Sequence, residues 1–179
     1  MTKRGGYLEV ITGPMFAGKS TALLGLYEQA TGARVLIKPK ADTRSVGVVR
    51  THDGNETEAV IMATSEEIKA RRERYVFIDE GQFFDDGLTQ VCADMAKKGH
   101  VVRVAGLDKD FRDQPFGPMP ALMLEADILQ KLWTRCVVCD GPFASKTARK
   151  TNPDTLQQIL VGGADKYEPR CRRCFKEDT

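Results

Sequence analysis

The segment Gly13 to Ser20, GPMFAGKS, restricts the possible folds of this chain more than any other part of its sequence. It fits the pattern G-x4-G-K-[ST] of phosphate-binding loops. The glycines let the backbone turn tightly, so that successive N–H groups point at phosphate oxygens, and a following helix adds the positive end of its dipole. In such a loop the side chain of Lys19 reaches the β- and γ-phosphates, and the Ser20 hydroxyl binds Mg²⁺. The residues expected at the nucleotide are therefore Gly13, Pro14, Met15, Phe16, Ala17, Gly18, Lys19 and Ser20.

The residues on both sides of this loop have the pattern that it requires. The apolar run 7–12 predicts a strand, and residues 19 to about 30 predict a helix with Leu23, Leu26 and Tyr27 on one face. Further strands are expected at 34–37, 75–79, 100–105 and 128–134, a hairpin at 46–62, a polar helix or turn at 65–74, and an amphipathic helix around 88–95. Apolar strands separated by helices predict an α/β fold with a parallel sheet. The Gly- and Pro-rich segment 106–120 is expected to be a long functional loop.

Two carboxylates follow the apolar strand YVFID, namely Asp79 and Glu80. Asp79 is suited to the Mg²⁺-binding acid that accompanies a phosphate-binding loop. Glu80 then lies near the carboxyl edge of the sheet, where α/β proteins bind their ligands. A glutamate there can activate a water, which gives hydrolysis, or take the proton of a substrate hydroxyl, which gives a kinase. The dipeptide alone leaves both reactions open.

Four of the five cysteines form two C-x2-C pairs, which are Cys136 with Cys139 and Cys171 with Cys174. Four thiolates satisfy a tetrahedral Zn²⁺ and leave no position open for chemistry, so the metal is expected to be structural. The 31 residues between the pairs exceed the roughly 15–20 of a compact zinc ribbon. This long segment closed at its base by the metal, called the lasso below, is free to cover a ligand. We expect a nucleotide-binding core at residues 1–135 and a zinc-binding lasso domain at residues 136–179.

Composition excludes several classes of protein. The formal net charge is only +2, and the basic segments 71–74 and 170–173 are short, so a nucleic-acid partner is not expected. No apolar run approaches the roughly 18 residues of a membrane helix, so no membrane partner is expected either. We see no signal peptide, and cysteines in metal-type spacing fit a reducing compartment, so we expect a cytoplasmic protein.

Taken together and in order, these motifs resemble the cytosolic-type thymidine kinase family, the zinc-containing branch with a RecA-like core. The resemblance covers nearly the whole chain. Besides the phosphate-binding loop and the cysteine pairs, it rests on these segments: Asp42-Thr43-Arg44, Thr51-His52-Asp53, Asp79 to Phe84, Gly106-Leu107-Asp108, Asp110-Phe111-Arg112, Pro115-Phe116-Gly117, Gly162-Gly163 and Asp165-Lys166-Tyr167.

The resemblance implies transfer of the γ-phosphate of ATP to the 5′-hydroxyl of thymidine, which gives thymidine monophosphate and ADP. Glu80 would be the general base, and Asp79 would act through Mg²⁺. Asp42, Thr43, Arg44 and Gln82 would lie at the ATP site. The lasso would close over the base, and the residues implied at the nucleoside are Met15, Phe83, Leu107, Phe111, Phe116, Thr147, Gln158, Ile159, Leu160, Val161, Gly162 and Tyr167. From the residues alone, Phe111 and Phe116 are expected in the core rather than at a ligand.

Other functions fit parts of the sequence. A RecA-like ATPase would use Glu80 to activate water, a zinc-ribbon module on a motor would bind nucleic acid, and a kinase of this fold would serve another deoxynucleoside. The resemblance also implies a homotetramer, which no residue of the sequence indicates by itself.

Overall fold

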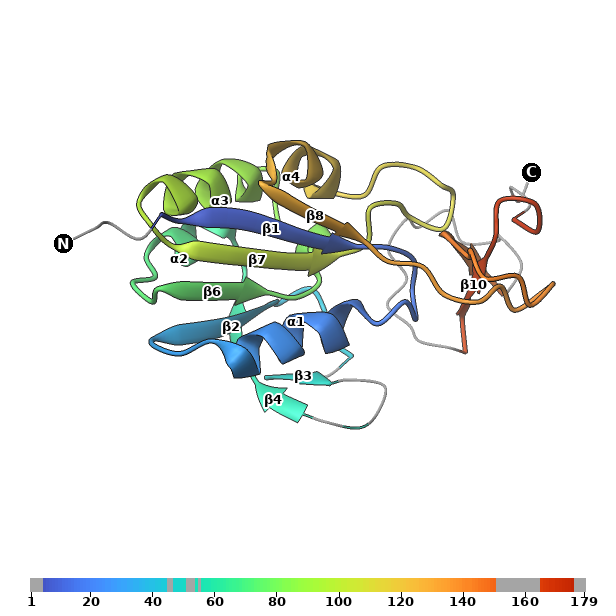
Figure 1. Ribbon diagram of the computed structural model, residues 1–179, viewed down its shortest axis with the longest axis horizontal. Helices are drawn as coiled ribbons and strands as arrows, with labels where there is room; N and C mark the ends of the chain where they lie inside the picture. The colour runs from blue at the N-terminus through green and yellow to red at the C-terminus, as the bar shows by residue number, and fades with distance from the viewer. Residues whose placement is uncertain (1–4, 45–46, 51–53, 55, 151–164, 176–179) are drawn as a thin grey trace.

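The computed structural model describes residues 5–44, 47–50, 54, 56–150 and 165–175. Its centre is a parallel six-stranded sheet in the order β5-β2-β6-β7-β1-β8 (Figure 1). The strands are β1 (Tyr7–Thr12), β2 (Arg34–Pro39), β5 (Val60–Met62), β6 (Tyr75–Ile78), β7 (Val101–Gly106) and β8 (Ile128–Lys131). The predicted α/β fold with a P-loop and a parallel sheet is thereby confirmed.

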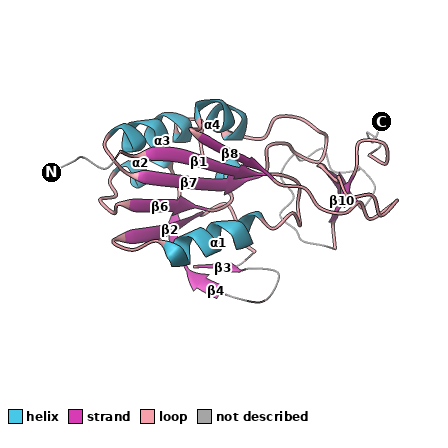
Figure 2. Ribbon diagram, viewed as in Figure 1, coloured by secondary structure: helices cyan, strands magenta, loops and turns pink. Residues whose placement is uncertain are grey.

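Helices cover the sheet on both faces, and Figure 2 shows the resulting layers. Helix α1 (Lys19–Gln29) packs on one face, where Ile11, Leu36 and Phe77 of the strands meet its buried Leu23. The other face is covered by α2 (Ser65–Lys69), α3 (Leu88–Lys97) and α4 (Met119–Glu125). Successive strand residues point to opposite faces, so both faces are apolar and the sheet forms a continuous core.

The expected hairpin is present, but it is only part of the segment that was assigned to it. Strands β3 (Val48–Arg50) and β4 (Glu56–Glu58) pair in antiparallel fashion. The end of the segment instead forms β5, which pairs in parallel with β2 at the edge of the main sheet. The segment 106–120 is a loop as far as residue 118, and then α4 begins at Met119. A helix start there is compatible with Pro120, because the first turn of a helix needs no N–H donor at that position.

The chain beyond Thr134 forms a small lobe at the carboxyl ends of the sheet strands, to which their arrows point in Figure 1. Within the described residues it contains one antiparallel pair, β9 (Lys146–Arg149) with β10 (Tyr167–Arg170). A bridge between Thr134 and Ala144 closes the base of the lobe. Because ligands of parallel α/β sheets bind at the carboxyl edge, this lobe stands over the expected site.

Candidate active site

The phosphate-binding loop joins β1 to α1, as the sequence predicts. Gly13 has a φ of 143°, and a Cβ built there would lie 2.4 Å from the carbonyl oxygen of Leu132, so only glycine fits. Gly18 precedes α1 with a φ of 82°. The Lys19 ammonium donates to the carbonyl oxygen of Pro14 at 2.8 Å, which holds the lysine across the loop. Burial lowers the pKa of Lys19, against the opposing charges of Glu80 and Asp79.

Ser20 and Asp79 lie together at the start of α1 and the end of β6. The Ser20 hydroxyl donates to the Asp79 carboxylate, with both oxygens at 3.1 Å. Asp79 is almost fully buried. Burial, followed by the neighbouring charge of Glu80, raises the pKa of Asp79 to about 7. A hydroxyl beside a carboxylate is the donor set by which P-loop proteins hold Mg²⁺, so these two residues fit that ion.

Glu80 takes a left-handed backbone conformation, with a φ of 52°, directly after β6. A non-glycine residue in this conformation is uncommon and is often found at functional sites. The turn lifts the Glu80 carboxylate out of the sheet, where it accepts hydrogen bonds from Arg44 and from the Gln82 amide. The side-chain oxygen Oε1 of Gln82 accepts a hydrogen bond from the Leu107 N–H at 3.0 Å, so this glutamine joins the candidate base to the loop after β7.

Arg44 also binds Asp42, with 2.7 Å between its Nε and the Asp42 Oδ1. Asp42 is paired a second time, with Lys38 Nζ at 3.1 Å. Burial would raise the pKa of Asp42, but Arg44 and Lys38 lower it overall. Lys38 was not predicted, although a lysine that directly follows the apolar run 35–37, four residues before Asp42, is a visible signal. Thr43 is exposed.

Aromatic side chains line the neighbouring loop. The rings of Phe83 and Phe116 meet edge to face, with centroids 5.6 Å apart. Phe83 belongs to the short 3-10 helix η1 (Gly81–Phe83), which follows Glu80 directly. Phe116 is buried, and its N–H donates to the carbonyl oxygen of Asp108 at 3.1 Å. Phe83 donates its N–H to the carbonyl oxygen of Glu80, and Phe116 packs on Phe83, so both phenylalanines lie near the candidate base. Leu107 is linked to Glu80 through Gln82.

Phe111 belongs to a second group, which contacts the small lobe. Its ring lies 6.5 Å from that of Tyr167, and the Arg149 guanidinium lies 4.5 Å over it. Buried Lys146 pairs with Asp113 at 2.5 Å, which fixes the same loop. Lys146, Arg149 and Asp113 were not predicted, because their charges resemble those of an exposed loop.

Thr147 connects the small lobe to the phosphate-binding loop. Its hydroxyl oxygen accepts a hydrogen bond from the Met15 N–H at 3.0 Å, and the residue is buried. Met15 is therefore held by the same residue that the resemblance places near the base. The segment Gln158, Ile159, Leu160, Val161 and Gly162 lies outside the described residues.

The four paired cysteines come together in the small lobe. Their sulfur atoms all lie within 4.8 Å of one another, and Cys139 and Cys171 are 3.8 Å apart. Zinc–sulfur bonds of about 2.3 Å place tetrahedral ligands about 3.8 Å apart, so the cluster fits Zn²⁺. A disulfide would need about 2.05 Å, and these thiols are free. The fifth cysteine, Cys92, lies on the buried face of α3 and belongs to the core, as expected.

Among the residues that the structure describes, no helix is both long and apolar enough to cross a lipid bilayer.

Comparisons with known proteins agree with this geometry. Relatives named thymidine kinase from Bacteroides fragilis (strain YCH46) and Bacteroides thetaiotaomicron are each 42% identical to this chain. The alignments span 186 and 185 residues and cover 98% and 97% of the chain, and 89% of each relative. Among solved structures, the ATPase DotB of Legionella pneumophila matches 67% of this chain and 34% of its own, with 17% identity and a TM-score of 0.41. That likeness is too weak to support an argument. The family model described as thymidine kinase matches residues 6–175, and the chain belongs to this family.

Proposed function

We infer that this protein transfers the γ-phosphoryl group of ATP to the 5′-hydroxyl of thymidine. One juxtaposition carries this inference. Glu80 follows Asp79, which is bonded to Ser20 of the phosphate-binding loop, and it precedes Phe83, which packs on Phe116. A base placed between a phosphate site and an aromatic wall can serve an acceptor that binds against that wall.

In this mechanism the Glu80 carboxylate takes the proton of the 5′-hydroxyl as its oxygen attacks the γ-phosphorus. The bond between the γ-phosphorus and the bridging oxygen breaks, and ADP leaves with the electron pair. Lys19 leaves the Pro14 carbonyl to reach the β- and γ-phosphates. Mg²⁺ bound with ATP at Ser20 and Asp79 would neutralise charge on these phosphates.

Arg44 has two alternative partners in this mechanism, Glu80 and the triphosphate. Arg44 pairs with Glu80, and although burial would lower its pKa, the two anions Glu80 and Asp42 raise it. A triphosphate supplies stronger anionic partners for a guanidinium than a single carboxylate. Binding of ATP would therefore draw Arg44 from Glu80 and free the carboxylate to accept a proton.

We propose that residues 136–179 form a zinc-stapled lobe that covers the nucleoside. The cysteine cluster supports this, because it closes the base of the lasso, and Thr147 and Phe111 join the lobe to the site. The assignment of Gln158 to Gly162 to the base rests on the resemblance. We also propose that the enzyme is a cytoplasmic homotetramer. Light scattering at low micromolar concentration tests the oligomeric state.

The experiment that tests the function is the rate of ADP release from Mg·ATP with thymidine, deoxyuridine, deoxycytidine, deoxyadenosine or no nucleoside. We expect release that depends on thymidine. A rate of ADP release that is the same with and without every nucleoside would indicate an ATPase. A rate of ADP release that DNA raises would indicate a nucleic-acid motor.

A further inference from the structure

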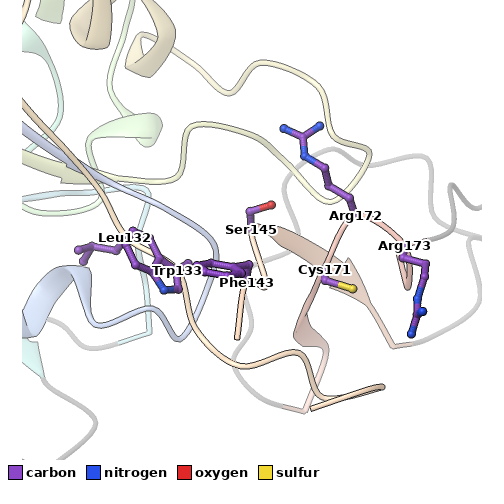
Figure 3. Close-up of a pocket in the computed structure, with 7 residues that line it drawn as sticks. All are labelled: Leu132, Trp133, Phe143, Ser145, Cys171, Arg172 and Arg173. Carbon is purple, nitrogen blue, oxygen red and sulfur yellow. The ribbon is translucent and has the colours of Figure 1, made fainter. Parts of the chain in front are cut away.

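Two large aromatic side chains lie on the surface just beyond the edge strand β8. Trp133 and Phe143 are 57% and 64% exposed, and their rings lie 5.7 Å apart at an angle of 50°. With Leu132, Ser145 and the segment 171–173 they line a cavity of about 410 Å³ (Figure 3). This volume lies within the roughly 300–1,000 Å³ of small-molecule sites.

The cavity adjoins the phosphate-binding loop at two points. The Leu132 N–H donates to the carbonyl oxygen of Thr12 at 2.7 Å, and its own carbonyl oxygen would clash with any side chain at Gly13. Ser145 is two residues before Thr147, whose hydroxyl binds the Met15 N–H. A ligand in the cavity would thus lie beside the loop that holds the phosphates.

The order of the strands decides which end of a nucleotide lies there. The strands lie in the spatial order β6-β7-β1-β8. The phosphate-binding loop follows β1, and on one side of it Asp79 and Glu80 follow β6. Trp133 follows β8 on the other side. A triphosphate that lies along this loop with its γ-phosphate facing Glu80 directs its α-phosphate and its nucleoside away from β6, toward β8.

We propose that Trp133 and Phe143 bind the purine ring of the phosphoryl donor by stacking. This rests on the proposed function, because it requires a nucleotide donor with its γ-phosphate at Glu80. The aromatic faces fit a flat heteroaromatic ring. In Figure 3 the guanidinium groups of Arg172 and Arg173 lie apart from the aromatic pair. The base is therefore held by stacking, without hydrogen bonds from these two side chains to distinguish one purine from another. The site therefore accepts adenine and guanine nucleotides alike.

Trp133 is the single tryptophan of the chain, so its fluorescence reports on this cavity without any substitution. The test uses the wild-type protein with Mg²⁺ and, in turn, ADP, GDP, inorganic tripolyphosphate and thymidine, with calorimetry to measure binding independently. We expect saturable quenching by both purine nucleotides and no change with tripolyphosphate, which fills the same loop without a base. Thymidine alone is expected to leave the emission unchanged.

A variant, Phe143→Leu, removes one aromatic face and keeps an apolar side chain. We expect it to weaken ADP binding roughly tenfold and to leave tripolyphosphate affinity unchanged. Equal weakening of both ligands would show that the aromatic pair only supports the lobe, and would overturn the proposal. ADP binding without quenching, or emission that depends on protein concentration alone, would overturn it as well. If ADP binds and quenches but thymidine is not phosphorylated, the donor site stands and the proposed function fails.

Discussion

The hydroxyl of Thr147 accepts a hydrogen bond from the backbone N–H of Met15 at 3.0 Å, and this bond joins the zinc lobe to the phosphate-binding loop. Thr147→Val keeps the shape of the side chain but leaves the Met15 N–H without its acceptor. We expect the KM for ATP to rise roughly fivefold, the equivalent of about 1 kcal/mol. Thr147→Ser keeps the hydroxyl and should behave like the wild type.

Steady-state kinetics with each substrate varied in turn checks this expectation. If Thr147→Val raised only the KM for thymidine, the threonine would act at the base and not on the loop.

The cysteine cluster predicts one zinc per chain. Cys171→Ser should lose the metal, because three thiolates and a hydroxyl bind Zn²⁺ less well, and should lose thymidine-dependent turnover as the base of the lasso opens. Elemental analysis of the purified protein measures the metal. Cys92→Ala is the matched control, since it removes a buried thiol of the core and should retain the zinc. A metal-free protein with full activity would refute the zinc site.

Asp85 predicts a pH dependence of stability. Its carboxylate accepts from the Ser65 hydroxyl at 2.6 Å and from the Ser65 N–H at 2.8 Å, at the start of α2. These bonds lower the pKa of Asp85 from its ordinary value of 3.8. The folded state thus binds the proton less tightly than the unfolded state, so the stabilisation is complete above pH 3.8 and is lost as pH falls through the lowered pKa.

Asp85→Asn should therefore lower the free energy of unfolding at pH 7 by about 1 kcal/mol or less, since the site is exposed. The difference from the wild type should shrink as the pH falls below 3.8. Urea titrations across this range, with Asp86→Asn as the exposed control, test the sign. A difference that grew on acidification would be the wrong sign for this hydrogen bond.

The core strands could be predicted because each one is a local run of mostly apolar residues. Strand β1 begins and ends at Tyr7 and Thr12, as its apolar run indicates, and α1 begins directly at Lys19 of the loop motif. The order of the strands in the sheet could not be predicted in this way, since it depends on crossovers between segments far apart in the chain. The insertion of β7 between β6 and β1 is not visible in any single segment.

Strand β9 could not be predicted for a physical reason. Its residues include Lys146 and Arg149, which are polar in sequence yet buried in the structure. Lys146 pairs with Asp113, and the Arg149 guanidinium lies over the ring of Phe111, both from a loop more than thirty residues earlier. A pattern of local hydrophobicity cannot show such tertiary compensation. The pairing of Arg44 with Glu80 is of the same kind, because the two residues lie 36 positions apart.

Glu80→Gln tests the candidate base. The amide keeps the size of the side chain but cannot accept the proton of the 5′-hydroxyl, so turnover should fall by about two to four orders of magnitude. Calorimetry should show that ATP still binds, because Lys19, Ser20 and Asp79 are unchanged. Asp86→Asn is the control, as it removes a nearby exposed carboxylate outside the site. Near-normal turnover in Glu80→Gln would rule this glutamate out as the base.

The destination of the γ-phosphoryl group tests the central claim most directly. The measurement uses ATP labelled with ¹⁸O on the γ-phosphate, incubated with Mg²⁺, thymidine and the wild-type protein, followed by mass spectrometry of all phosphorylated products. The mechanism predicts labelled thymidine monophosphate in an amount equal to the ADP formed, with no matching labelled inorganic phosphate. Labelled inorganic phosphate equal to the ADP, without thymidine monophosphate, would show that water rather than thymidine accepts the phosphoryl group and would contradict the account.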